Sequence, residues 1–369
     1  MIANIAIIST GNTHLYKGVA NTYLKGRTGP DINEYKIFAN REVKAGTYQP
    51  IPNGLDYNIK KIDVTEIEKY KTIAYLIIKD DSVRYEQYWD EYNEGSYSGS
   101  FSMAKSFVGL LVGCALHDGY IKTMDEPIGD FIPQYKEGDN AKITIRDLLT
   151  MSSGINFDEN YVSAFAYPAK AYYGSDITKL TLEKYHAAEE PGKVFKYLSG
   201  NTELLGMIIE KASGKRLADY MSESLWGKLG AKNPALWSLD HENGMEKAYC
   251  CFNSNARDFS RFGLLLLHRG NWNGAQLISE FYIDELMKPA LLKTPEGGQN
   301  TRYGYHWWMM DYMDHHITYA RGILGQYIIV IPDKNMVIVR LGHKRSKEII
   351  GDHPKDIFLF IDKALELYP

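Results

Sequence analysis

The chain has 369 residues, of which 44% are hydrophobic and 24% are charged, and its formal net charge is −4. This composition is that of a folded globular protein and excludes a disordered chain. The slightly acidic balance gives no reason to expect nucleic-acid binding, and the length suffices for two domains or for one large domain with an insertion.

No stretch of the sequence approaches the roughly 20 consecutive apolar residues that a membrane-spanning helix requires. Residues 2–8 are apolar but too short, and they lack the basic lead and the cleavage site of a signal peptide. We therefore expect no transmembrane span in this chain, and no signal peptide is visible in it.

Three cysteines are too few for a disulfide framework. Cys114 lies on the apolar face of a predicted helix and is expected to be a small core residue. Cys250 and Cys251 are adjacent, and a vicinal disulfide is one alternative. We expect instead two unpaired thiols in a strand, because a bridge between neighbouring residues is geometrically difficult.

The first part of the chain predicts an arm followed by a β-hairpin. Residues 1–55 include turn-rich segments, and we expect an extended arm laid over the fold. Residues 72–78 and 83–89 are rich in β-branched and aromatic side chains and are separated by a polar turn. These two runs predict paired antiparallel strands.

The middle of the chain, residues 121–250, is expected to be mostly helical with long loops. Apolar residues recur at helical spacing, and capping residues or glycines stand at the expected ends. The predicted helices around and within this region cover residues 102–118, 144–151, 202–212 and 255–268.

The last third of the chain returns to strands and closes with a helix over residues 355–367. The predicted strands cover residues 303–310, 317–320, 326–331 and 336–341. Early strands, central helices and late strands predict an α+β fold, in which helices flank an antiparallel sheet made from both chain ends. The expected parts are an arm (1–55), a sheet domain (56–120 with 251–369) and a mostly helical inserted domain (121–250), with the active site between the last two.

Ser102-Met103-Ala104-Lys105, at the start of an apolar helix, is the most informative motif. Positions i and i+3 share one helix face, so the amine of Lys105 can reach the hydroxyl of Ser102. The positive end of the helix dipole and partial burial both disfavour the ammonium form. The motif therefore predicts a nucleophilic serine with a neutral lysine as its base.

Four further segments join this motif in order: residues 143–154, 191–202, 256–263 and 322–326. Together the five segments resemble the serine β-lactamase and penicillin-binding protein superfamily, on the branch of class C enzymes, carboxylesterases and 6-aminohexanoate-dimer hydrolase. The resemblance runs from about residue 65 to the end. It implies the β-lactamase/transpeptidase-like fold and hints at a bacterial periplasmic or envelope location.

The second family motif is a tyrosine followed two residues later by asparagine or, in the aminohexanoate-dimer hydrolase branch, by serine. Tyr197-Leu198-Ser199 fits the serine version. The resemblance implies that the Tyr197 phenol passes a proton between nucleophile, amine and leaving group. The alternative is a tyrosine packed ahead of a helix, with Ser199 as the N-cap.

The third family motif, on an edge strand, is normally Lys-Thr-Gly or His-x-Gly, whereas this chain has Ala320-Arg321-Gly322. By strand alternation, Arg321 should point away from the face of Ala320. Gly322 permits close approach of substrate, and the backbone N–H of Ile323 is our choice for the second oxyanion donor beside that of Ser102. Strand termination is the structural alternative for Gly322.

The same branch also suggests two residues near the substrate. His343, at a strand end, matches a histidine close to the active site, although a structural role is the alternative. Tyr161 corresponds to a tyrosine that contacts substrate from a loop. Aromatic residues such as Tyr172, Tyr173 and Trp308 are either cleft walls or core residues.

We therefore expect a serine hydrolase that cleaves a small-molecule amide or ester through an acyl-enzyme intermediate, without cofactor or metal. No Gly-x-Ser-x-Gly elbow or His-Glu-x-x-His helix is present, and His315-His316 is poorly spaced for a metal. The alternatives are a β-lactamase, a D-alanyl-D-alanine peptidase, or a non-catalytic ligand sensor built on the penicillin-binding fold.

Overall fold

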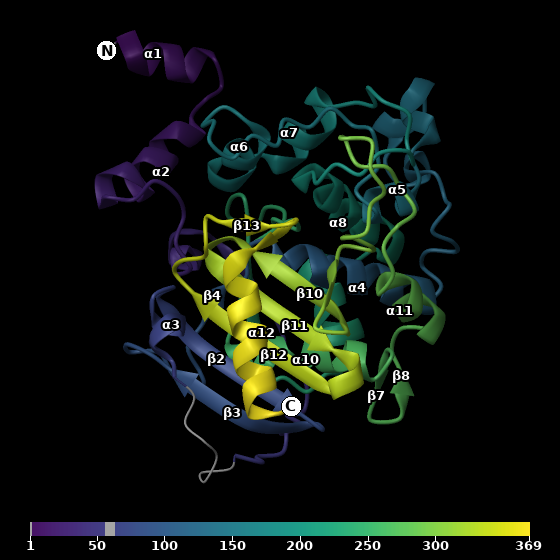
Figure 1. Cartoon of the computed structure of the whole chain (residues 1–369). Coiled ribbons are helices and arrows are strands. Elements are labelled where there is room, and N and C mark those ends of the chain that lie inside the picture. The colour runs from purple at the N-terminus through teal and green to yellow at the C-terminus, as the bar shows by residue number, and fades with distance from the viewer. Residues whose placement is uncertain (1, 56–62) are drawn as a thin grey trace.

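A computed structural model describes residues 2–55 and 63–369 and contains a six-stranded antiparallel sheet (Figure 1). The strand order is β3-β2-β12-β11-β10-β9, so the N-terminal hairpin pairs with the C-terminal strands, as the sequence predicted. The strands are β2 (Thr72–Lys79), β3 (Ser82–Tyr88), β9 (Trp308–Tyr312), β10 (His315–Gly322), β11 (Gln326–Ile331) and β12 (Met336–Gly342).

Helices cover both faces of this sheet, which explains why β2, β11 and β12 are almost continuously apolar and buried. α12 (Lys355–Leu367) lies on one face, and α4 (Met103–His117) and α10 (Ala256–Leu267) lie on the other (Figure 1). α10 approaches closely at Gly263, where an added Cβ would lie 2.6 Å from the side chain of Val337. α4 packs against β10 and β11 on the same face of the sheet.

A second sheet, in the order β1-β5-β6-β4, ties distant parts of the chain together. Its strands are β1 (Asn40–Val43), β4 (Ser98–Gly99), β5 (Ala235–Ser238) and β6 (Phe252–Ser254). β5 belongs to the region predicted as a mostly helical insertion, yet it pairs with a strand of the N-terminal arm. β6 leads directly from the helical part into α10.

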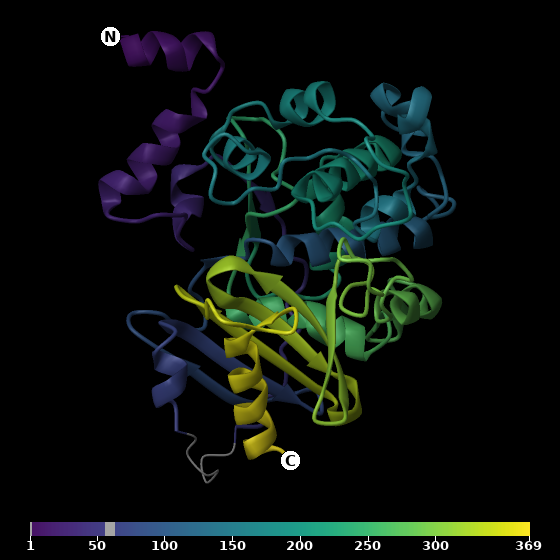
Figure 2. The same cartoon turned by 45° about the horizontal axis from the view of Figure 1, so that its top comes forward.

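The helical part packs above the sheet, against α4 (Figure 2). Thr144 is the N-cap of α5, as the sequence indicated, and Asp147 completes a reciprocal capping box with it. α8 runs through the middle of this part, contacts both α4 and α5, and ends at Gly214 in the left-handed conformation. The helices here are α5 (Ile145–Leu149), α6 (Tyr167–Tyr173), α7 (Ile177–Lys184), α8 (Ser199–Ser213) and α9 (Leu217–Met221).

Two predictions about secondary structure need correction. The arm over residues 1–55 is not simply extended, because it contains α1 (Ile2–Ser9), α2 (His14–Asn21) and β1. Short helices depend on tertiary packing, which sequence pattern does not show. The strand predicted over residues 303–310 begins only at Trp308, because the chain turns at His306, whose φ is +62°.

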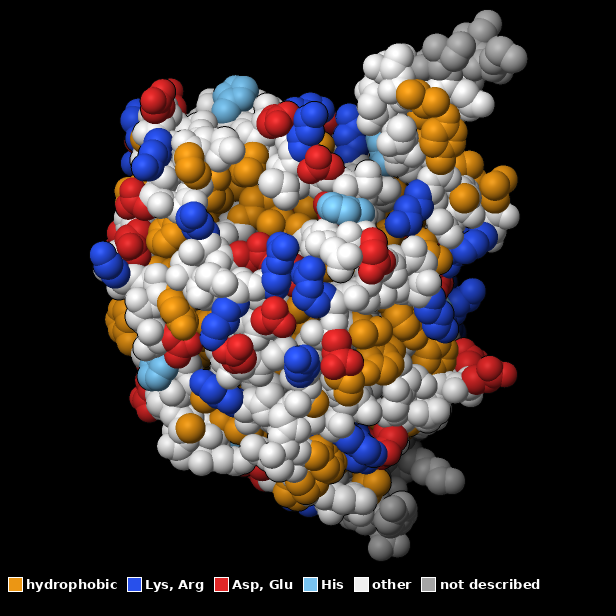
Figure 3. Space-filling view, turned by 180° about the vertical axis from the view of Figure 1, so that it is seen from behind, with side chains coloured by type: hydrophobic (Ala, Val, Ile, Leu, Met, Phe, Trp, Pro, Cys, Tyr) orange, Lys and Arg blue, Asp and Glu red, His pale blue; other side chains and the backbone are white. Residues whose placement is uncertain are grey.

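Shorter elements complete the described chain. They are α3 (Thr65–Glu68), α11 (Glu280–Leu286), and the two small hairpins β7 (Asn271–Trp272) with β8 (Ala275–Gln276) and β13 (Ile349–Ile350) with β14 (His353–Pro354). Within residues 2–55 and 63–369, no helix is both long and apolar enough to cross a bilayer. Positive and negative side chains are interspersed over the face shown in Figure 3.

Candidate active site

Ser102 stands at the N-cap of α4, and its hydroxyl makes no capping bond to the helix. The residue before it, Phe101, has a φ of +46°, an unfavourable conformation for a bulky side chain that the surrounding structure must enforce. Because α4 starts here, the N–H of Ser102 has no intrahelical partner. Both the hydroxyl and the N–H of Ser102 are therefore available for chemistry.

Lys105 lies one turn into α4 and is only 1% exposed. Its Nζ is 3.2 Å from the Oγ of Ser102 and donates to the carbonyl of Tyr249 at 2.9 Å. The amine also lies 5.1 Å from the ring centre of Tyr197 and 5.2 Å from that of Tyr249. Within the described residues, no carboxylate lies within ion-pair distance of this amine, so the predicted Ser102–Lys105 pair forms without a competing acid.

Tyr197 immediately precedes α8 and faces the Lys105 amine. Its ring packs against Trp308, with centroids 5.4 Å apart, and against Tyr303 at 5.9 Å. Ser199 is the first residue of α8, and Leu198 occupies the N-cap position without a side-chain bond. The alternative in which Ser199 caps the helix is therefore wrong.

Glu159 is a site residue that the sequence did not reveal. Its carboxylate accepts from the N–H of Ser199 at 2.7 Å, from the Ser199 hydroxyl at 2.5 Å and from the Tyr161 hydroxyl at 2.6 Å. A negative charge at a helix N-terminus is stabilised by the helix dipole. No local pattern signals this contact, because Glu159 lies in a loop 40 residues before its partner.

Gly322 ends β10 beside the segment that leads to Ser102. A Cβ on Gly322 would lie 2.3 Å from the carbonyl oxygen of Ser100, so only glycine fits this approach. Ile323 follows as the first residue of a 3₁₀ turn, and its N–H therefore lacks a partner inside that turn. The strand end thus brings a second free N–H toward the site.

Arg321 points away from the face of Ala320, as strand alternation predicted. Ala320 is fully buried in the core between the sheet and α4. The Arg321 guanidinium instead stacks 3.4 Å from the ring centre of Trp308 and donates to the carbonyl of Asp352. Both Trp308 and the neighbouring Trp307 are core residues.

His343 contacts the N-terminal arm. Its Nδ1 is 3.3 Å from the carboxylate of Asp31, and its Nε2 is 3.3 Å from the hydroxyl of Tyr92. The hydrogen bond with His343 holds the pKa of Asp31 well below its usual value. His343 is not among the residues that line the cleft beside Ser102, and its contacts favour a structural role for it.

Ser102 opens into a cleft of about 200 Å³. Tyr161, Ser199 and Ile323 lie in its wall, which brings these three predicted residues together with the nucleophile. The remaining wall comes from α2 and the two residues after it, residues 28–30, Phe101, α6 with the loop before it, and residues 249–250.

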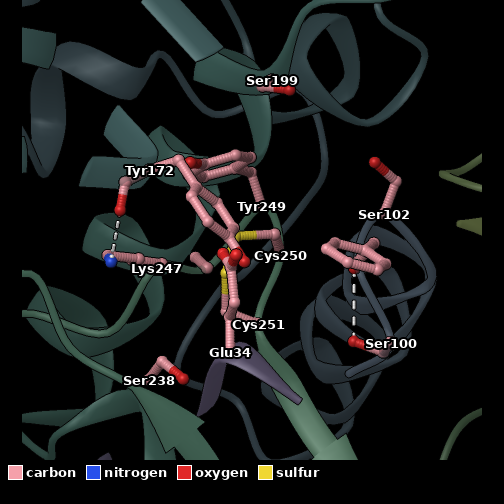
Figure 4. Close-up of a disulfide and its surroundings, with 12 residues drawn as sticks. Glu34, Ser100, Ser102, Tyr172, Ser199, Ser238, Lys247, Tyr249, Cys250 and Cys251 are labelled. Carbon is pink, nitrogen blue, oxygen red and sulfur yellow. Dashed lines mark hydrogen bonds between the residues drawn. A yellow bond between two sulfur atoms is a disulfide. The ribbon is translucent and has the colours of Figure 1, made fainter. Parts of the chain in front are cut away.

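Cys250 and Cys251 form a vicinal disulfide, so the expectation of two unpaired thiols in a strand is wrong. Figure 4 shows the disulfide beside Tyr249, with Ser102 on the other side of the cleft. Cys250 lines the cleft, and Cys251 has a φ of +68° just before β6 begins. The disulfide thus lies next to the carbonyl that binds Lys105.

Comparison with known proteins identifies the family. A sequence model of the Beta-lactamase family matches residues 64–352. A curated relative, the 6-aminohexanoate-dimer hydrolase of Paenarthrobacter ureafaciens, is 25% identical over 321 residues, which cover 81% of this chain and 80% of that protein.

Solved structures share the fold. A Bacillus anthracis protein provisionally named 6-aminohexanoate-dimer hydrolase superposes with a TM-score of 0.77, at 23% identity and with 91% of each chain covered. A family VIII carboxylesterase superposes with a TM-score of 0.65, at 15% identity over 82% of this chain and 94% of its own. The fold is β-lactamase/transpeptidase-like, and the chain belongs to the beta-lactamase family.

Proposed function

We propose that this protein is a serine hydrolase that cleaves a small amide or ester through an acyl-enzyme on Ser102. The observation that supports it best is the 3.2 Å contact between the Ser102 hydroxyl and a buried lysine amine. That lysine donates to a backbone carbonyl, and within the described residues no carboxylate forms an ion pair with it. A lysine beside a serine hydroxyl is one of the bases that activate such a nucleophile. The names of the relatives include both an amide hydrolase and an esterase.

In the first step, the Ser102 oxygen attacks the substrate carbonyl carbon while its proton passes to Lys105, with Tyr197 coupled to the amine. The N–H groups of Ser102 and Ile323 stabilise the oxyanion that forms. The tetrahedral intermediate then expels the alcohol or amine, which takes a proton from Tyr197, while Lys105 passes the former serine proton back to Tyr197. Water hydrolyses the resulting ester and restores the free serine.

The two main parts of the chain each contribute to this site. The sheet part supplies Ser102, Lys105 and Ile323 through α4 and the end of β10. The helical part supplies Tyr197 and Ser199 at the start of α8. We accordingly place the active site between the sheet domain and the helical domain.

Two observations argue against an efficient β-lactamase or D-alanyl-D-alanine peptidase. Ala320 is uncharged where those enzymes carry a cation, and the adjacent Arg321 is turned onto Trp308. A charge-assisted contact to the substrate carboxylate is worth about 1.5–3 kcal/mol, which corresponds to roughly a ten- to hundredfold change in rate. Ser199 is in addition already bound to Glu159.

Steady-state assays with p-nitrophenyl acetate and nitrocefin test this function. We expect measurable ester hydrolysis, slow or absent nitrocefin hydrolysis, and loss of both in Ser102→Ala. Ester turnover that persists in Ser102→Ala would contradict the mechanism. Nitrocefin turnover that exceeds that of the ester would favour the β-lactamase alternative.

A further inference from the structure

The wall of the cleft beside Ser102 contains no Asp, Glu, Lys or Arg side chain among the described residues. Its lining is aromatic, aliphatic, hydroxylic or glycine, with one histidine. Burial lowers the pKa of that histidine, His14, so it is neutral at physiological pH. The apolar members of the wall are Leu15, Val19, Tyr23, Pro30, Phe101, Tyr161, Val162, Ala164, Pro168, Ala169, Tyr172, Tyr173, Tyr249, Cys250 and Ile323.

α2 forms one side of this cleft although it lies outside the region matched by the family model. The Nε2 of His14 is 2.8 Å from the carbonyl of Ala164, which joins α2 to the loop before α6. At Gly18 an added Cβ would lie 3.3 Å from the ring of Tyr173. The N-terminal segment is therefore part of the cleft wall and directly contacts two other wall residues, Ala164 and Tyr173.

The charged groups that surround the cleft are engaged behind the wall. The Lys17 amine lies 4.2 Å from the ring centre of Phe38. Glu34 is 3% exposed and binds Arg27 and the hydroxyl of Tyr173. Tyr173 lines the cleft whereas Glu34 does not, so this carboxylate binds a wall residue without being part of the wall itself. Since no charged side chain among the described residues lines the cleft, neither end of a charged substrate finds a counter-ion in its wall.

The cleft lies on the acyl side of the proposed reaction. Ser102 and Ile323, whose N–H groups would hold the oxyanion, both line it. Tyr197, which would protonate the leaving group, does not. On the proposed mechanism, the part of the substrate that stays on Ser102 after the first step would therefore occupy this apolar space.

We propose that the cleft selects a neutral acyl group with an apolar chain or ring, so that the substrates are uncharged esters or amides of apolar carboxylic acids. This inference rests on the proposed function and goes beyond it, because it names the acyl group and assigns α2 a role in choosing it.

A series of p-nitrophenyl esters tests the selectivity. We expect kcat/KM to rise roughly three- to fourfold per added methylene from acetate to octanoate, as each methylene leaves water. We also expect the neutral pentanoate ester to exceed the anionic monoester of glutaric acid, which has the same chain length, by at least about tenfold. A flat series, or equal rates for pentanoate and glutarate, would overturn the proposal.

A matched pair of variants tests the wall itself. Val19 lines the cleft and is 43% exposed, so Val19→Asp adds a charge to the wall without disturbing the core. Ala20, the next residue of α2, is exposed and lies outside the wall. We expect Val19→Asp to lower the ratio of octanoate to acetate kcat/KM about tenfold, whereas Ala20→Asp changes it less than about twofold.

The possible results distinguish a failure of the cleft inference from a failure of the proposed function. Equal selectivity ratios in Val19→Asp and Ala20→Asp would refute the role of α2. If acetate is hydrolysed by Ser102 but the chain-length series is flat, only the cleft inference fails. If no ester is hydrolysed and Ser102 cannot be acylated, the proposed function fails first.

Discussion

Replacement of Lys105 by methionine separates its catalytic role from its structural one. General-base catalysis contributes about 10²- to 10⁴-fold to rate, or about 2.7–5.5 kcal/mol of activation free energy. Lys105→Met removes the base while retaining most of the side-chain volume. We therefore expect kcat for p-nitrophenyl acetate to fall at least about a hundredfold.

The stability cost of the same change should be small. The Tyr249 carbonyl loses a donor, which costs about 1–3 kcal/mol when it is left buried. Replacement of the buried polar amine by an apolar side chain of similar size offsets part of this cost. A thermal melt should therefore show a folded variant whose Tm stays within several degrees of the wild type.

Lys247 offers a matched control. It is fully buried, donates to the carbonyl of Tyr172 at 2.7 Å and lies 3.4 Å from the ring centre of Phe38. Lys247→Met makes the same chemical change on the other side of the disulfide from Ser102 (Figure 4), and we expect kcat to fall less than about tenfold. A Lys105→Met enzyme that keeps kcat within tenfold of the wild type, or a Lys247→Met enzyme that loses as much, would refute the assignment of the base.

Two further predictions concern the fold around the site. Burial lowers the pKa of His306 from 6.5 to about 3. As the pH falls, the unfolded chain therefore binds a proton at this histidine before the folded chain does. Up to about 4–5 kcal/mol of unfolding free energy should be lost between pH 6.5 and pH 3. Urea unfolding should show this loss in the wild type but a smaller one in His306→Gln; identical pH slopes would contradict it. In denaturant without reductant, thiol titration should detect one thiol per chain, that of Cys114, and three after reduction of the Cys250–Cys251 disulfide. Three thiols without reductant would show that the disulfide is absent.

Much of the fold could be predicted from local patterns. The hairpin of β2 and β3 followed from two runs rich in β-branched and aromatic residues around a polar turn, and α10 followed from helical periodicity. In the structure Asn255 is the N-cap of α10, and its side chain accepts from the N–H of Asp258. The approach of Lys105 to Ser102 followed from helix geometry alone. These features depend on residues close together in sequence.

The features that sequence reasoning missed depend on contacts between distant segments. α2 is a short helix held by His14 against the loop before α6, 150 residues away. Glu159 binds Ser199 from a loop, and no spacing rule links the two. The Cys250–Cys251 disulfide occurs with Cys251 in the left-handed backbone conformation, which non-glycine residues rarely adopt. Adjacent cysteines are therefore more often unpaired, and no pattern in the sequence indicated this conformation. Each of these lies at or beside the cleft, so the substrate-binding surface was less predictable than the catalytic pair.

Covalent labelling of the nucleophile tests the central claim most directly. A fluorophosphonate probe should add one adduct per chain, and peptide mass spectrometry should locate it on Ser102. Ser106→Ala is a suitable control, because Ser106 lies one turn further along α4 and binds the carbonyl of His306 at 2.7 Å. The account predicts labelling of the wild type and of Ser106→Ala but none of Ser102→Ala; an adduct on another residue, or equal labelling of Ser102→Ala, would contradict it.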